Sequence, residues 1–204
     1  MSEVRNRAAT QVLLVVHRGY DAGAAFARSV GGAIEHSEHR MILRREPAPV
    51  IFDPLVSVRS AQPSDGPFIT TCLSAAFGLP AVPVEQSAVE RLEPLYLESL
   101  SRDLASTRVI DYAQVPVGTV RVDRDDDTAG IYGFAVLPEF QGRGIGRQVL
   151  SDLARDLPAE GAPNVSLEVS TSNDAALRLY LSCGFDVMGT EDYFAVPVAA
   201  SSGP

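Results

Sequence analysis

The sequence predicts an α/β protein with a mixed, partly antiparallel sheet flanked by helices. Residues 108–113 and 118–122 are two strand-like runs around a tight turn, which predicts an antiparallel hairpin. Residues 129–137 and 165–170 are also strand-like, and a glycine-rich loop and a helix-like stretch separate them. That crossover makes its two strands parallel, so the sheet that contains both arrangements is mixed.

Composition narrows the class of protein. The chain has 204 residues, enough for one domain of ordinary size or one domain plus a fragment, and a formal charge of −9. A negative charge disfavours non-specific binding to nucleic acid and to membrane surfaces. No apolar run approaches the roughly 20 residues that span a bilayer. The apolar run at 11–16 is too short for a signal peptide, so we expect a cytoplasmic protein.

The first elements of the main domain follow a proline-rich stretch. Pro47, Pro49 and Pro54 favour extended backbone, and we place a linker at residues 45–54 and the main domain at 55–198. Residues 56–59 alternate as a strand does. Ser64 and Pro67 then predict the start of a helix that runs to about residue 76, and apolar spacing predicts a second helix over residues 84–104.

After the hairpin, residues 123–127 form an acidic turn that we interpret as a solvated loop rather than a metal site. Helices are predicted over about 144–157 and 174–183, with Gly184 ending the second. Residues 185–187 and 193–196 read as a closing pair of strands, and residues 199–204 as a flexible tail. The two cysteines and two of the histidines belong to no metal-binding motif. We expect Cys72 and Cys183 to be buried core residues, and His36 and His39 to be solvated surface residues.

The loop from Gln141 to Gly146 is the strongest chemical signal. Glycines without Cβ atoms let backbone N–H groups approach an anion, and the helix that follows adds unpaired donors and a positive dipole end. Arg143 and Arg147 add positive charge in an acidic protein. A dinucleotide fingerprint would need glycine at Arg147, and the Gly-Lys-Ser/Thr ending of a P-loop is absent. By itself the loop is a weak signal, since many such loops are only tight turns.

A second motif makes the loop specific. Gln141-x-x-Gly144-x-Gly146 is similar to the Gln/Arg-x-x-Gly-x-Gly/Ala motif of the GNAT superfamily of acyl-CoA N-acyltransferases. The segment that follows resembles that family's Asn-x-x-Ala-x-x-Leu-Tyr-x-x-x-Gly-Phe, carried here by Asn173, Ala176, Leu179, Tyr180, Gly184 and Phe185. The resemblance covers about residues 55–198.

The resemblance implies a site for acetyl-CoA as co-substrate, with no metal. The residues implied in binding it are the strand Phe134, Ala135 and Val136, the loop Gln141, Gly142, Arg143, Gly144, Ile145, Gly146 and Arg147, and Asn173. N–H groups near Val136 are implied to polarise the thioester carbonyl. Asn173 has two competing uses, contact with the pantetheine arm and capping of the following helix.

Two catalytic roles follow. Tyr180 matches the family tyrosine that protonates the departing thiolate, while on its own a tyrosine on an apolar helix face is more often core packing. Glu168 alternates with apolar residues on its strand and is the best candidate for the base that deprotonates the amine. An ordinary exposed strand carboxylate explains Glu168 equally well, and Tyr132 is a second candidate in the cleft.

The first segment resembles the last. Sliding residues 12–30 by 153 positions matches Val12 with Val165, Leu14 with Leu167, Val16 with Val169 and Gly31 with Gly184, and farther on Glu38 with Glu191. Ala27 stands where Tyr180 falls, and no glycine loop precedes this copy. Residues 1–44 are therefore interpreted as a degenerate GNAT-like β-α-β half-domain, as in tandem members of the superfamily. Such a half-domain should dock within the chain or dimerise.

These observations predict an acetyl-CoA-dependent N-acetyltransferase that moves an acetyl group to a primary amine by direct attack in a ternary complex. The expected partner is a small-molecule or peptide amine acceptor, and neither nucleic acid nor a membrane is expected to bind. The sequence leaves open whether the protein forms a homodimer. The alternative is a catalytically inactive acyl-CoA-binding regulatory module. A weaker third reading is binding of another phosphorylated metabolite.

Overall fold

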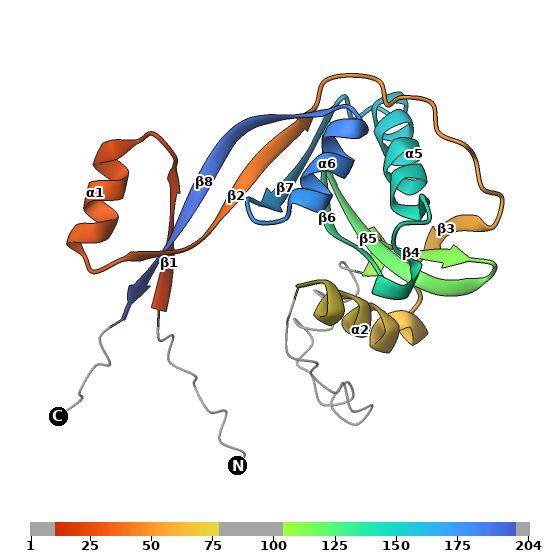
Figure 1. Cartoon of the computed structure of the whole chain (residues 1–204), viewed down its shortest axis with the longest axis horizontal. Helices are drawn as coiled ribbons and strands as arrows, with labels where there is room; N and C mark the ends of the chain where they lie inside the picture. The colour runs from red at the N-terminus through yellow and green to blue at the C-terminus, as the bar shows by residue number, and fades with distance from the viewer. Residues whose placement is uncertain (1–10, 78–103, 199–204) are drawn as a thin grey trace, which may run out of the picture. The chain divides into compact units, whose positions relative to one another are not determined.

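The computed structural model describes residues 11–77 and 104–198 (Figure 1). The helix predicted over residues 84–104 therefore lies outside the described residues, except for Leu104. The strands form one eight-stranded sheet in the order β1-β8-β2-β7-β6-β5-β4-β3, so the sheet is mixed as predicted. The strands are β1 (Gln11–His17), β2 (Ala33–Leu43), β3 (Val56–Ser60), β4 (Thr107–Tyr112), β5 (Val115–Asp125), β6 (Thr128–Val136), β7 (Asn164–Ser170) and β8 (Phe185–Pro197). The helices are α1 (Asp21–Ser29), η1 (Pro63–Asp65), α2 (Gly66–Phe77), η2 (Pro138–Phe140), α5 (Ile145–Ala159) and α6 (Asp174–Ser182).

The chain forms two compact units that interleave along the sequence. Unit 1 comprises residues 1–41, 168–177 and 187–204, and unit 2 comprises residues 42–167 and 178–186. Each unit therefore draws on segments far apart in the sequence.

Unit 2 contains the predicted hairpin and crossover. β3, β4, β5 and β6 pair antiparallel in sequence order, and β6 pairs parallel with β7 from Thr128–Asn164 to Ile131–Leu167. Its core is built from β-branched strand residues and the apolar face of α5, including Val109, Ile110, Val117, Val120, Val149 and Leu150. Cys72 and Cys183 are buried and free, as expected for core residues. Burial raises the pKa of the Cys72 thiol to about 11, so this thiol is a poor nucleophile.

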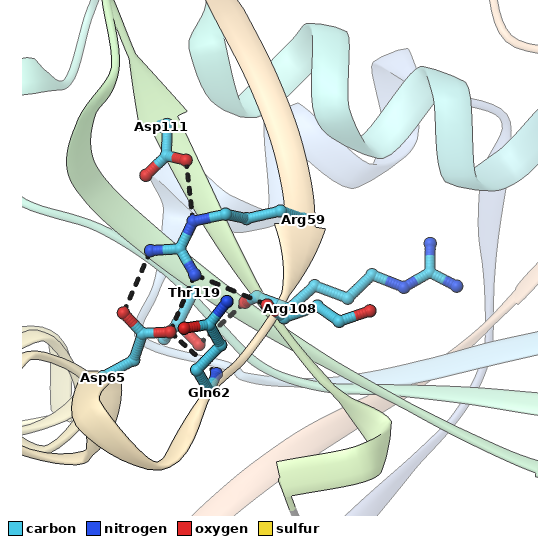
Figure 2. Close-up of polar contacts among 7 residues, drawn as sticks. Arg59, Gln62, Asp65, Arg108, Asp111 and Thr119 are labelled. Carbon is cyan, nitrogen blue, oxygen red and sulfur yellow. Dashed lines mark hydrogen bonds and ion pairs between the residues drawn. The ribbon is translucent and has the colours of Figure 1, made fainter.

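The edge strand β3 is held by an arginine (Figure 2). Arg59 donates to Asp111 on β4 at 3.0 Å and to Asp65 in η1 at 2.7 and 2.9 Å. Asp65 also accepts from the backbone N–H of Gln62 at 2.8 Å, which completes a capping box at the entry to α2. One charged side chain thus ties the edge strand, its neighbour and the start of a helix together.

Unit 1 contains β1, α1, most of β2 and β8, and the end of β7. β1 pairs antiparallel with β8 from Gln11–Pro197 to His17–Glu191. Val16, Ala27 and Phe194 form a small core between this pair and α1. The bounds of β1 and α1 shifted by 153 positions coincide with those of β7 and α6, so the two segments that match in sequence also have matching elements.

The predicted closing pair of strands was wrong, because residues 185–197 form the single strand β8. The polar residues of its middle read as a turn in the sequence. In the structure they are paired with neighbouring segments: Arg18 donates to Asp192 at 3.1 Å, Ser37 donates to it at 2.6 Å, and Glu191 faces His17 at 3.2 Å. Those tertiary partners let charged residues continue a strand.

Candidate active site

β6 carries a bulge just before its end. Ala135 pairs with Thr119 and Tyr132 with Arg121, so two residues of β6 oppose one residue of β5. One of the two is Gly133, whose φ of +53° is a left-handed value that favours glycine. The bulge turns the last part of the strand, where Phe134, Ala135 and Val136 lie. A glycine inside a strand pattern was the sequence signal for this bulge, and the sequence analysis missed it.

The loop after β6 folds back on the strand end. The Gln141 side-chain amide donates to the carbonyl of Val136 at 2.9 Å. Arg143 donates to the carbonyl of Glu139 at 3.0 Å, and its guanidinium lies 5.0 Å from the centre of the Phe140 ring. These contacts fix the loop next to the three strand residues that the sequence analysis assigned to the cofactor.

The loop ends at an open helix N-terminus. Gly142 and Gly144 have φ values of +74° and +86°, which a side chain would strain. Gly144 is the N-cap of α5, and neither a side-chain cap nor an acidic residue is present in the first turn. The first N–H groups of α5 are therefore available to an anion, with Arg147 exposed on the same turn. This arrangement fits a phosphate group.

Tyr180 lies beside this strand in unit 2. Its ring centre is 6.5 Å from that of Phe134 on β6 and 6.3 Å from that of Phe185. The residue is only 7% exposed, and burial raises its pKa to about 12. Its phenol therefore stays protonated at neutral pH. The structure places Tyr180 next to the predicted cofactor strand, so core packing and a role as acid are compatible.

Glu168 lies in unit 1, on the second half of β7. Its pKa is raised, first by partial desolvation and then by Glu38 and Glu191, while Arg40 opposes the shift. Glu38 comes from β2 and Glu191 from β8, so three strands contribute one carboxylate each. A raised pKa makes a carboxylate a stronger base, which is what proton transfer from an amine requires.

Aromatic residues surround these carboxylates. Tyr193 on β8 stacks on His36 with ring centres 4.3 Å apart and nearly parallel planes. Partial desolvation and then the charges of Glu168 and Glu38 raise the pKa of Tyr193 to about 12. The sequence analysis did not assign Glu38, Tyr193 or His36 to this group. The match of Glu38 with Glu191 in the repeat was the one signal that marked this position.

The other two predicted residues have local partners. The Asn173 side chain accepts from the Ala176 N–H at 3.0 Å, so in this structure it caps α6. Tyr132 is exposed, and the Arg121 guanidinium lies 5.2 Å from its ring centre. Within residues 11–77 and 104–198, no cluster of metal ligands occurs and no helix is long and apolar enough to span a membrane.

The geometry of loop, strand and tyrosine agrees with comparison to known proteins. The sequence profile of the Acetyltransferase (GNAT) family matches residues 74–185, more than half of the chain. The chain therefore belongs to the acetyltransferase (GNAT) family.

Individual relatives are similar over regions of different length. The [ribosomal protein bS18]-alanine N-acetyltransferase of Salmonella typhimurium is 45% identical over 60 residues, which are 29% of this chain and 40% of that protein. The GCN5-related N-acetyltransferase from Sphaerobacter thermophilus superposes with a TM-score of 0.69 at 18% identity, over 94% of this chain and 62% of that one. A tandem GNAT protein from the clavulanic acid biosynthesis pathway superposes with a TM-score of 0.61 at 14% identity, over 94% of this chain and 65% of that one. The chain thus spans less than two thirds of each of these three proteins, and the two structural matches support the fold alone.

Proposed function

We propose that the protein transfers an acyl group, in the first place acetyl, from coenzyme A to a primary amine. The observation that carries the proposal is the uncapped N-terminus of α5, preceded by Gly142 and Gly144 and flanked by Arg143 and Arg147. Acetyl-CoA is the co-substrate of this family and supplies an activated acyl group when bound. The donors at the helix start suit its pyrophosphate.

Binding roles follow from position along the chain. The N–H groups of Ile145, Gly146 and Arg147 begin α5 and are assigned to the pyrophosphate. The backbone of Phe134 to Val136, turned by the bulge, is assigned to the pantetheine arm and to polarisation of the carbonyl. Gln141 supports that strand end through its bond to the Val136 carbonyl.

Proton-transfer roles are assigned to two residues. Tyr180 holds a proton at its phenol oxygen and gives it to the departing thiolate. Glu168 takes a proton from the amine, directly or through water. An alkylamine with a pKa near 10 is about one part in a thousand neutral at pH 7, a cost of about 4 kcal/mol without such help.

The experiment is a titration calorimetry measurement with acetyl-CoA, followed by release of free thiol across a panel of amines. The panel includes an alanine peptide, because the Salmonella relative acts on alanine of a ribosomal protein. Arg147→Glu should weaken binding of acetyl-CoA by about tenfold or more, because it places an acid where the helix end favours an anion. Arg155→Glu, in the same helix but paired with Asp152 at 3.1 Å, is the matched control.

The outcomes separate the candidate functions. Binding followed by thiol release with an amine supports the acyltransferase. Binding without release under any amine would support the acyl-CoA-binding regulatory module instead. No binding of acetyl-CoA would contradict both.

A further inference from the structure

The internal repeat produces two copies of the same set of elements within the chain. β1 and α1 correspond to β7 and α6 at a shift of 153 positions, and β2 corresponds to β8. The strand order β1-β8-β2-β7 maps onto its own reverse when each strand is exchanged with its repeat partner. The two copies are thus built alike, and the neighbours of one copy indicate what the other copy is shaped to contact.

Equivalent residues differ sharply in burial. Val165 and Cys183 are fully buried, whereas their partners Val12 and Val30 are 48% and 42% exposed. In the second copy, β6 and α5 bury these residues. β6 pairs with the first half of β7, and the Ser151 hydroxyl of α5 lies 3.6 Å from the Cys183 thiol. In the described part of the first copy no such strand and helix lie against β1 and α1. Residues 11–77 and 104–198 therefore leave its core-like surface uncovered.

The free edge of β1 has no charged residue to block pairing. Residues 11–16 are Gln-Val-Leu-Leu-Val-Val, with Leu13 and Val15 exposed. The opposite edge strand of the sheet, β3, carries Arg59. Natural edge strands usually carry such a charge or a proline, because an uncharged edge is a template for another strand.

The backbone of β1 also faces outward in a defined register. The N–H of Arg18 bonds to Thr190 of β8, continuing the register in which His17 lies opposite Glu191. Because backbone groups alternate between the two sides of a strand, those of Leu13 and Val15 point away from β8. Leu13 and Val15 thus present hydrogen-bonding groups at the middle of the edge.

We propose that the free backbone edge of β1 at Leu13 and Val15, together with the exposed Val12 of β1 and Phe26 and Val30 of α1, binds the same surface of a second copy of the chain. β6 and α5 are already paired with β7 and α6 and cannot cover β1 as well. An antiparallel β1–β1 contact is self-complementary, since Leu13 of one copy lies opposite Val15 of the other and both pairs exchange hydrogen bonds. The two α1 helices then run antiparallel on the same face of the sheet.

The charges at the two ends of α1 are complementary in this antiparallel arrangement of two copies. α1 has Asp21 in its first turn and Arg28 in its last, with no other charged residue between them. Antiparallel packing of two such helices brings the acidic end of each toward the basic end of the other. The surface itself is neutral, so the formal charge of −9 of each chain is carried elsewhere.

The test is the molar mass in solution, measured by sedimentation over a wide range of concentration. We expect a dimer of about 44 kDa, twice the 21.8 kDa of one chain. Val15→Lys and Phe26→Glu should each weaken the dimer by about tenfold or more, because they place charge at a paired edge and in an apolar contact. Val58→Lys, at an exposed site on β3, should leave the dimer unchanged.

A measurement on the unaltered chain guards against misfolded variants. Amide hydrogen exchange at Leu13 and Val15 should be slow in the dimer and should speed up on dilution, while exchange in β4 should not change. A monomer at every concentration overturns the proposal. So does a dimer that neither β1 nor α1 variant weakens, because another surface would then hold it.

Discussion

Tyr180 combines two properties that usually compete. It is buried against Phe134 and Phe185, as a core residue is, and burial raises its pKa to about 12. A phenol with that pKa keeps its proton throughout the neutral range and is therefore present as a proton donor when the thiolate departs. Packing thus holds the acid in its protonated form.

Tyr180→Phe keeps the ring and removes the proton donor. We expect turnover to fall by about a hundredfold, within the range for loss of a general acid, with the affinity for acetyl-CoA nearly unchanged. Thiol release gives the first quantity and calorimetry the second. Tyr20→Phe, at an exposed position, is the control. Unchanged turnover in Tyr180→Phe would remove the assignment of the acid.

At the scale of elements, β2, β7 and β8 bring carboxylates together. Glu38 on β2 raises the pKa of Glu168 on β7, and Glu191 on β8 acts in the same direction. Glu38 belongs to residues 1–44, which the sequence analysis interpreted as a degenerate half-domain. We therefore expect the N-terminal segment to influence the base.

Glu38→Gln removes one of the charges that raise the pKa of Glu168. A base works in its deprotonated form, so the rate falls as pH drops below its pKa. Lowering that pKa should move the acidic limb of the kcat/KM profile to lower pH. Glu35→Gln on the same strand should leave the limb in place, because Glu35 does not act on Glu168. If the acidic limb of the kcat/KM profile shifts in neither variant, Glu168 is not the base.

Arg59 is the corresponding element-scale feature of unit 2. Arg59→Met would leave Asp111 buried without its donor, and we expect a loss of about 1–3 kcal/mol in the free energy of unfolding. Arg124→Met, which removes an exposed pair with Glu160, should cost less than about 1 kcal/mol. Thermal or urea unfolding measures both, and equal losses would contradict the role of Arg59.

The pH dependence of the Arg59 effect has a definite sign. The hydrogen bond from Arg59 is the main cause that lowers the pKa of Asp65 below its usual value of 3.8. A lowered pKa in the folded state stabilises the fold above the unfolded-state pKa, and this contribution is lost as pH falls through the lowered value. The difference in stability between Arg59→Met and the unaltered chain should therefore shrink in strong acid.

At the scale of the whole molecule, β2 occupies the position between β8 and β7 in the strand order. Removing residues 1–43 deletes β1, α1 and β2, so both neighbours lose a hydrogen-bonded strand. We expect the shortened chain to lose cooperative melting and to aggregate, as judged by calorimetry and light scattering against the full chain. A shortened chain of equal stability, solubility and activity would contradict a structural role for this segment.

Much of unit 2 could be predicted because its signals are local. The hairpin, the crossover and the glycine loop depend on turn residues and periodicity within short windows, and they were confirmed. The course of β8 could not be predicted in this way, because its polar middle becomes a strand only through Arg18, His17 and Ser37, more than 150 residues away. The capping bond from the Ala176 N–H to the Asn173 side chain likewise became visible only in the structure.

The sequence by itself determined the family, the mixed sheet and the loop that begins α5, because motif spacing and backbone preference are properties of neighbouring residues. Only the tertiary structure decided which carboxylates surround Glu168, how β6 bulges at Gly133, and which copy of the repeat is covered. These depend on strand pairing between distant segments, and pairing is set by the free energy of burying whole faces rather than by any short pattern.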